Sequence, residues 1–142
     1  MKKIILITSA LLGLAFVSQG QNHFVGEKYG GGIVFSVDSS GKNGLIAAAK
    51  DLSGKYSWQK AKDTCKSLRL NGFRDWYLPN KENLNKLYLN LAVVGGFSSN
   101  NYWSSSEFGS GQAWFQIFSN GNQNFSYWYF KFRVRAVRTF NN

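Results

Sequence analysis

The sequence of 142 residues predicts an α+β fold with two helices and mostly antiparallel short strands. The composition is 44% hydrophobic and 17% aromatic, which is typical of a folded chain with a core and excludes disorder. Helical spacing of apolar residues is confined to two segments. The 15 glycines, the single proline and several short β-rich runs indicate strands that are joined by turns.

The first 20 residues are predicted to be a signal peptide. Lys2 and Lys3 precede an apolar stretch from Ile4 to Val17, and Ser18-Gln19-Gly20 fits a small-residue cleavage site. The apolar stretch is shorter than the roughly 20 residues that span a bilayer, so we expect export and no membrane anchor. The exported protein is then periplasmic, at the cell surface or secreted, and residues 21–142 are expected to form a single domain.

Strands are expected at the start of this domain. Phe24–Tyr29 is a candidate for a short strand, and Ile33–Val37 has a clear strand pattern. Leu45–Ala49 follows the turn Asp38–Gly41 as a buried strand. Residues 32–49 are therefore predicted to form a hairpin.

The first helix is predicted to begin after Ser57 as its N-cap and to end near Asn71-Gly72. Its apolar stripe is Trp58, Ala61, Cys65 and Leu68. Cys65 is the only cysteine, so it cannot form an intrachain disulfide, and we expect it to be buried.

The second helix is predicted to begin after Asn80, because Pro79 keeps the preceding segment extended and Asn80 is a suitable N-cap. Its inward positions are Leu84, Leu87, Tyr88 and Leu91.

The rest of the chain has β patterns. Tyr102–Ser106 and Ala113–Phe118 are predicted strands, and a turn at residues 119–122 leads into residues 123–139. This last segment is too long for one ordinary strand, so we expect a bend near Tyr127–Lys131.

The order of several motifs along the chain resembles a known family. The motifs are Gly31–Phe35, Gly44–Ala48, Cys65 with Leu68, Arg74–Pro79, Tyr102–Ser105 and Val134–Arg138. Together they resemble the C-terminal domain of the Legionella collagen-like adhesin, from about Val25 to Phe140. The resemblance implies a C-type-lectin-like fold in which two helices flank a strand pair near the termini, with a second, Trp-rich group of strands. The named adhesin binds sulfated glycosaminoglycans as a trimer.

This chain departs from that family in two ways. The predicted leader is followed almost at once by the domain, so the adhesin's collagen-like stalk has no counterpart in the sequence and its avidity cannot be carried over. Tyr77 stands where family members usually have Arg, which removes one cation beside Pro79.

The sequence argues against an enzyme, and we predict no catalytic residue, no metal and no cofactor. The 7 carboxylates are scattered, and the serine run Ser104–Ser106 lacks a base because His23 is the only histidine. Calcium binding would need a cluster of carboxylates and amides that the sequence does not offer. We expect Asp75 and Glu107 to form ion pairs with Arg135 or Arg138.

The charge distribution favours binding of a polyanion. Two of the 17 basic residues lie in the predicted leader, so the remaining chain has 15 basic and 7 acidic residues, a net charge of +8. Residues 50–69 carry a local surplus of +4, from six cations and two acids. Residues 108–142 contain four cations and no acid. Two basic zones are therefore expected.

The predicted binding residues are Tyr127, Tyr129, Lys131 and Arg133. If residues 123–135 alternated as a strand, these side chains would share one face with Arg135. Lysine and arginine suit the sulfates and carboxylates of a polysaccharide, whose sugar rings pack on aromatic side chains. Phosphates and bases of a nucleic acid would suit the same surface. Whether Arg135 and Arg138 are structural or face the ligand is left open.

The sequence therefore predicts an exported, non-enzymatic, adhesin-like domain that binds an anionic glycan or another polyanion at a cell surface or matrix. The alternative is a structural or assembly module of the cell envelope, whose aromatic surface binds a protein partner. A further alternative is that neither group of residues binds a ligand: the basic charge only keeps the protein soluble, and the tryptophans belong to the core. Core positions are expected for Trp58, Trp76, Trp103 and Trp114, and Trp128 is left open.

Overall fold

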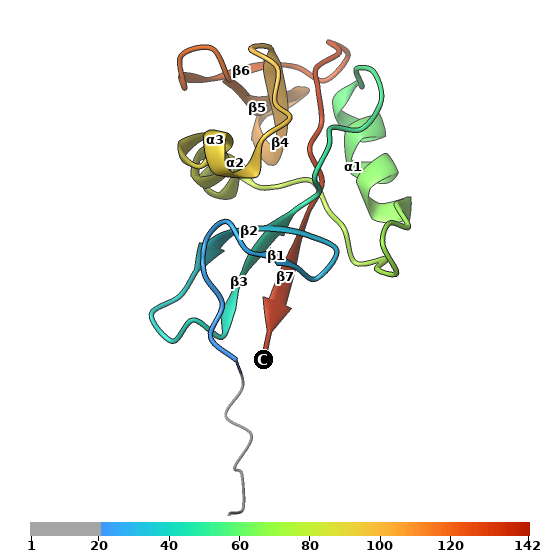
Figure 1. The fold of residues 1–142 in the computed structure, drawn as a ribbon. Helices are drawn as coiled ribbons and strands as arrows, with labels where there is room; N and C mark the ends of the chain where they lie inside the picture. Colours follow the sequence, from blue (N-terminus) through green and yellow to red (C-terminus); the bar gives the residue numbers. More distant parts are fainter. Residues whose placement is uncertain (1–20) are drawn as a thin grey trace, which may run out of the picture.

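The computed structural model describes residues 21–142 and has an α+β fold with three helices and two antiparallel sheets (Figure 1). The predicted signal peptide, residues 1–20, lies outside the described residues. One sheet contains β1, β2, β3 and β7, and the other contains β4, β5 and β6. The α+β prediction is confirmed.

The larger sheet has the strand order β1-β2-β3-β7. Its strands are β1 (Lys28–Tyr29), β2 (Gly32–Val37), β3 (Asn43–Ala47) and β7 (Val137–Asn141). The predicted hairpin at residues 32–49 is confirmed, although β1 is shorter and β3 begins earlier than expected. Because β7 pairs with β3, the two ends of the described chain meet, and the His23 Nε2 atom lies 2.6 Å from the Asn142 side-chain amide.

Helix α1 (Trp58–Ser67) packs with the predicted face inward, and Trp58, Ala61 and Cys65 are buried. The helix ends before the predicted Asn71-Gly72, because Leu68 is already extended and Leu70–Phe73 forms a separate turn. Ser57 is the N-cap residue, but its side chain accepts no capping hydrogen bond.

Helix α2 (Lys81–Leu89) begins as predicted, since the Asn80 side chain accepts a hydrogen bond of 2.8 Å from the backbone N–H of Asn83. A further helix, α3 (Leu91–Val94), follows directly and ends at Gly95, which has a positive φ of 78°. The prediction of two helices was therefore wrong. A helix of four residues is too short to show a helical period in the sequence.

The smaller sheet consists of β4 (Asn101–Gly109), β5 (Gln112–Ile117) and β6 (Gln123–Tyr127). The predicted bend is confirmed, because β6 ends at Tyr127 and a turn at residues 128–130 follows. Residues 132–136 then cross from the smaller sheet to the larger one, and they hydrogen bond with the segment between β3 and α1 (Figure 1). This crossing brings the end of the chain beside residues 48–56.

The core lies between the two sheets and the helices, in two clusters of buried side chains. Trp58, Trp76 and Trp103 are at most 2% exposed, which confirms their predicted core positions. Trp114 is only partly buried, with the Lys81 ammonium 3.5 Å from its ring centroid, so its core prediction was wrong. Cys65 is buried as predicted, and burial raises the pKa of its thiol to about 12.

Candidate functional site

The turn after β6 exposes consecutive aromatic side chains. Tyr127 is 49% exposed and Tyr129 is 70% exposed, and their rings lie parallel, within 4°, with centroids 5.5 Å apart. The neighbouring Trp128 stacks on Trp58 at the start of α1, with centroids 5.1 Å apart. The backbone N–H of Trp58 donates to the Trp128 carbonyl at 2.9 Å. The turn is therefore fixed to α1 while the two tyrosine rings face solvent.

Lys131 follows this turn and lines a groove of about 280 Å³. We call it the Lys131 groove; it is lined by Lys55, Ser99, Asn100, Asn101, Ile117, Ser119, Lys131 and Phe132. Lys55 reaches the same groove because Tyr56 and Phe132 exchange two backbone hydrogen bonds, of 2.8 and 3.0 Å. Both lysines are exposed, and none of the lining residues is acidic. One cation from each predicted basic zone thus meets in this groove.

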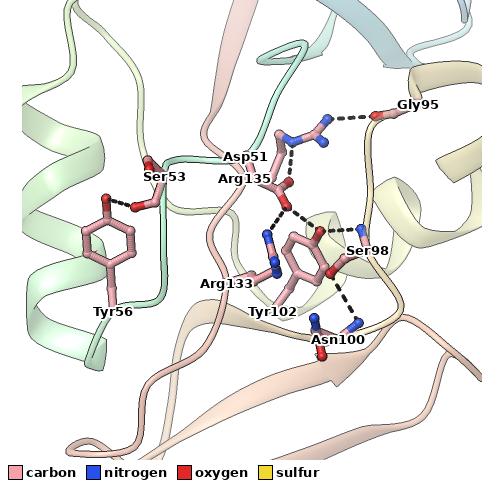
Figure 2. A network of polar contacts seen from close by, with 9 residues as sticks. All are labelled: Asp51, Ser53, Tyr56, Gly95, Ser98, Asn100, Tyr102, Arg133 and Arg135. Atoms are coloured by element: carbon pink, nitrogen blue, oxygen red, sulfur yellow. Dashed lines mark hydrogen bonds and ion pairs between the residues drawn. The ribbon is translucent and has the colours of Figure 1, made fainter.

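Arg133 lies just behind the groove and takes part in a polar network around Asp51 (Figure 2). One carboxylate oxygen of Asp51 accepts from the Arg135 Nε atom at 2.8 Å. The other accepts from the Tyr102 hydroxyl at 2.6 Å and lies 3.5 Å from the Arg133 Nη1 atom. Burial, followed by the hydrogen bond to Asp51, raises the pKa of Tyr102.

Arg135 holds the network together from inside the protein. It is 1% exposed, and its Nη1 atom donates at 3.0 Å to the carbonyls of both Ala48 and Gly95. Its guanidinium lies 3.9 Å from the Phe97 ring centroid. Burial lowers the pKa of Arg135, and the charge of Asp51 opposes that shift. The structure therefore places Arg135 in the structural role.

Arg138 is also structural. It is 7% exposed and forms a bidentate pair with Asp75, at 2.7 and 3.2 Å, which confirms the predicted pairing. The hydrogen bond from Arg138 lowers the pKa of Asp75. Glu107 is exposed and forms no ion pair within residues 21–142, so its predicted pairing was wrong. It lies near the end of β4, whereas the buried arginines lie on the crossing segment and β7.

The four predicted binding residues lie along one stretch of surface, but not on one strand face. Tyr127 and Tyr129 stack in the turn, Lys131 lines the groove, and Arg133 is 32% exposed beside it. The strand ends at Tyr127, so the alternation assumed for residues 123–135 does not occur. Lys55, the groove amides and Asp51 were missed, because nothing in the sequence shows that these separate segments meet.

Ser104, in the serine run considered as a nucleophile, and His23, considered as a base, both make other contacts. The Ser104 hydroxyl is buried and donates to the Trp114 carbonyl at 2.7 Å. His23 is held between Glu27, at 2.9 Å, and Asn142, which directly follows β7. Within the described residues, no three His, Cys, Asp or Glu side chains gather as metal ligands do. The chemistry that the exposed groups offer is hydrogen bonding, ion pairing and ring stacking.

Comparison with known protein families gives a match. The family model described as the Lcl C-terminal domain matches residues 38–138, a span that includes the turn after β6 and the Lys131 groove. No curated protein matches the chain. Within residues 21–142, no helix is long and apolar enough to cross a membrane.

Proposed function

Because the chain belongs to the Lcl C-terminal domain family, we propose that it is an exported, non-enzymatic domain that binds an anionic glycan or another polyanion at a cell surface or matrix. The family is associated with adhesins, which is consistent with a binding domain. The proposal assigns residues 1–20 to a removable signal peptide and residues 21–142 to one domain with a C-type-lectin-like fold.

The observation that carries the proposal is the Lys131 groove, whose lining residue Phe132 ends a row of stacked rings that begins with the pair Tyr127 and Tyr129. Two exposed ammonium groups, Lys55 and Lys131, and the side-chain amides of Asn100 and Asn101 line it without any carboxylate. Sulfate and carboxylate groups accept charge-assisted hydrogen bonds from such cations. The tyrosine rings beyond the groove offer flat faces on which a sugar ring packs its C–H groups.

Arg133 supports the same assignment. Its contact with Asp51 at 3.5 Å is too long for a strong hydrogen bond, and its Nε atom has no hydrogen-bond partner. Arg135, in contrast, donates to the same carboxylate at 2.8 Å. We therefore expect Asp51 to hold Arg133 loosely and to leave it able to turn toward an anion in the groove.

The test is retention on a heparin column with increasing salt. The double variant K55A/K131A removes the two groove cations, and K42A/K86A removes two cations that do not line this groove. Each cation that contacts the ligand adds about one unit to the slope of log affinity against log salt. We expect K55A/K131A to elute earlier than K42A/K86A and to lower that slope by about 2. Equal elution of the two double variants would refute the assignment of the groove.

The tyrosine pair is tested separately with Y127A/Y129A, measured against Phe24→Ala, which truncates an aromatic side chain that is 62% exposed elsewhere. We expect the tyrosine variant to lose affinity for a sulfated oligosaccharide by a factor that does not change with salt, because ring stacking is not ionic. A loss of affinity no larger than that of Phe24→Ala would show that the two tyrosine rings do not contribute to binding.

The assembly alternative is favoured by a different observation. Phe108 at the end of β4 and Phe125 in β6 stack face to face, 3.7 Å apart and within 3°, although they are 47% and 39% exposed. Exposed apolar patches of this kind often mark protein interfaces. Sedimentation in high salt distinguishes the two functions. An oligomer that persists there and is lost in F108A/F125A would support assembly, and a monomer would support the binding domain.

A further inference from the structure

Two tight turns from distant parts of the chain meet at one edge of the larger sheet. Gly30 and Gly31 connect β1 to β2 with positive φ angles of 61° and 86°. Asn71 and Gly72, with φ of 53° and 83°, connect Leu70 to Phe73, which exchange two backbone hydrogen bonds of 3.0 Å. Two positive φ angles in a two-residue loop define a type I′ turn. The Asn71 side-chain amide joins the turns by donating to the Gly31 carbonyl at 2.7 Å.

Arg138, a buried residue of β7, contacts both turns from inside the protein. It donates to the Gly30 carbonyl at 2.7 Å, and its guanidinium lies 3.7 Å from the Phe73 ring centroid. It also forms the bidentate pair with Asp75. The turns are thus held in place by a buried cation, a carboxylate and an aromatic ring, and their outer surface is preorganised.

Several hollows border the turn pair, and three of them include Asn71. One of about 430 Å³ is lined by residues 69–74, and one of about 490 Å³ by residues 28–33 with Ala49 and Asn71. The third, of about 400 Å³, lies between residues 48–53 and Leu68, Leu70 and Asn71. We call these three hollows together the turn-pair groove. They are larger than the Lys131 groove, at about 280 Å³.

The turn-pair groove is rimmed by cations. Lys28, Lys50, Arg69 and Arg74 all line it, and all four are exposed. Its one acidic lining residue, Asp51, has a side chain that is 9% exposed and paired with Arg135. The floor between the cations has no charge, since it is formed by glycines and by small or aliphatic residues such as Ile33, Ala49 and Leu70.

We propose that the turn-pair groove is a second binding site, for a segment of a sulfated or carboxylated oligosaccharide. The cations on the rim would pair with the anionic substituents, and the apolar floor would pack against the C–H faces of the sugars. The class of ligand rests on the proposed function, but the site is separate from the Lys131 groove and shares no lining residue with it. A long polyanion that reached both sites would bind more tightly than a short fragment, through avidity.

The test is an NMR titration of the protein with a sulfated tetrasaccharide, which is read at the backbone amides of Gly31, Asn71 and Gly72. We expect saturable shifts of these amides, and about tenfold weaker binding at them in R69A/R74A, because two ion pairs are lost. R69K/R74K keeps the charges and should restore most of the affinity. The controls are K42A/K86A, which loses the same charge elsewhere, and the unchanged signals of core amides as evidence of folding.

Each outcome decides for or against the site. Shifts that persist in K55A/K131A but weaken in R69A/R74A support a binding site in the turn-pair groove. This conclusion holds even if the amides of the Lys131 groove do not shift, a result that would refute the binding site proposed there. Shifts that are absent in the unmodified protein, or equal in R69A/R74A and K42A/K86A, overturn it. If a single-stranded DNA of similar charge shifts these amides at lower concentration than the tetrasaccharide, the assigned class of ligand is wrong.

Discussion

We expect removal of the Asp51 carboxylate to destabilise the fold more than removal of an exposed charged side chain. The Asp51 side chain is only 9% exposed, and it is the single carboxylate that neutralises Arg135, whose side chain is fully buried. Asp51→Ala therefore leaves a buried guanidinium without a counter-ion. It also leaves the Tyr102 hydroxyl with only the Ser98 N–H as a partner, at 2.9 Å.

The size of the effect follows from these contacts. Breaking a buried ion pair by removing one partner costs about 3–5 kcal/mol, and Arg135 already has one guanidinium nitrogen without a partner. The lost Tyr102 hydrogen bond falls within the same network, so its cost does not add in full. We expect the free energy of unfolding to fall by about 4 kcal/mol, and Tm by roughly 10–15 °C. This is a large part of the roughly 5–15 kcal/mol that stabilises a domain.

Urea and thermal unfolding, followed by circular dichroism, measure this loss. Asp63→Ala is the matched control, because Asp63 is an exposed carboxylate on α1 that accepts a side-chain hydrogen bond from Gln59 at 2.9 Å and forms no ion pair within residues 21–142. The control should change the free energy of unfolding by less than about 0.5 kcal/mol. If Asp51→Ala costs less than about 1 kcal/mol, Arg135 is adequately solvated without its partner and the reasoning about the network is wrong.

Three further measurements test other parts of the structure. Because burial raises the pKa of Cys65 to about 12, the thiol should resist alkylation at pH 8 in the folded protein and react fully in urea; rapid native labelling would contradict this. Gly31→Ala should destabilise the protein by about 1–3 kcal/mol more than Gly72→Ala in urea unfolding, because both glycines have positive φ but only Gly31 has an aromatic ring within 2.7 Å of the new Cβ. The pKa of Asp75 is lowered in the folded state, so its contribution is present above the ordinary carboxyl pKa and lost as pH falls through the folded value. The stability of Asp75→Asn should therefore approach that of the unmodified protein at low pH, and a gap that stays constant from pH 7 to pH 2 would exclude this linkage.

Local signals in the sequence predicted most elements. The β-branched and aromatic run at residues 33–37, the stripe that contains Trp58 and Cys65, and the Asn80 cap each depend on residues close together in the chain, and each is confirmed. The third helix was missed because four residues show no period. The first helix was predicted too long because the Asn-Gly pair at residues 71 and 72 was interpreted as a helix end, whereas it forms its own type I′ turn.

The candidate site was predictable only in part, because its groups come from segments that the crossing at residues 132–136 brings together. Tyr127, Tyr129 and Lys131 are close in sequence, so the alternating pattern of aromatic and basic residues indicated them. Lys55 joins Lys131 only through the backbone pairing of their neighbours, Tyr56 and Phe132. A local charge count adds the cations of each zone but contains no information about such a pairing.

The same crossing separates the arginines that a charge count treats as equal. From Lys131 to Arg138 the chain passes from the surface into the core, so that Lys131 is exposed, Arg133 is partly buried, and Arg135 and Arg138 are 1% and 7% exposed. The two buried arginines use the carboxylates Asp51 and Asp75. Because the charge of each of these two acids is offset by a buried arginine, neither acid opposes the exposed lysines and arginines of the two grooves. The positive potential that a polyanion would meet at the surface therefore comes from the exposed lysines and arginines.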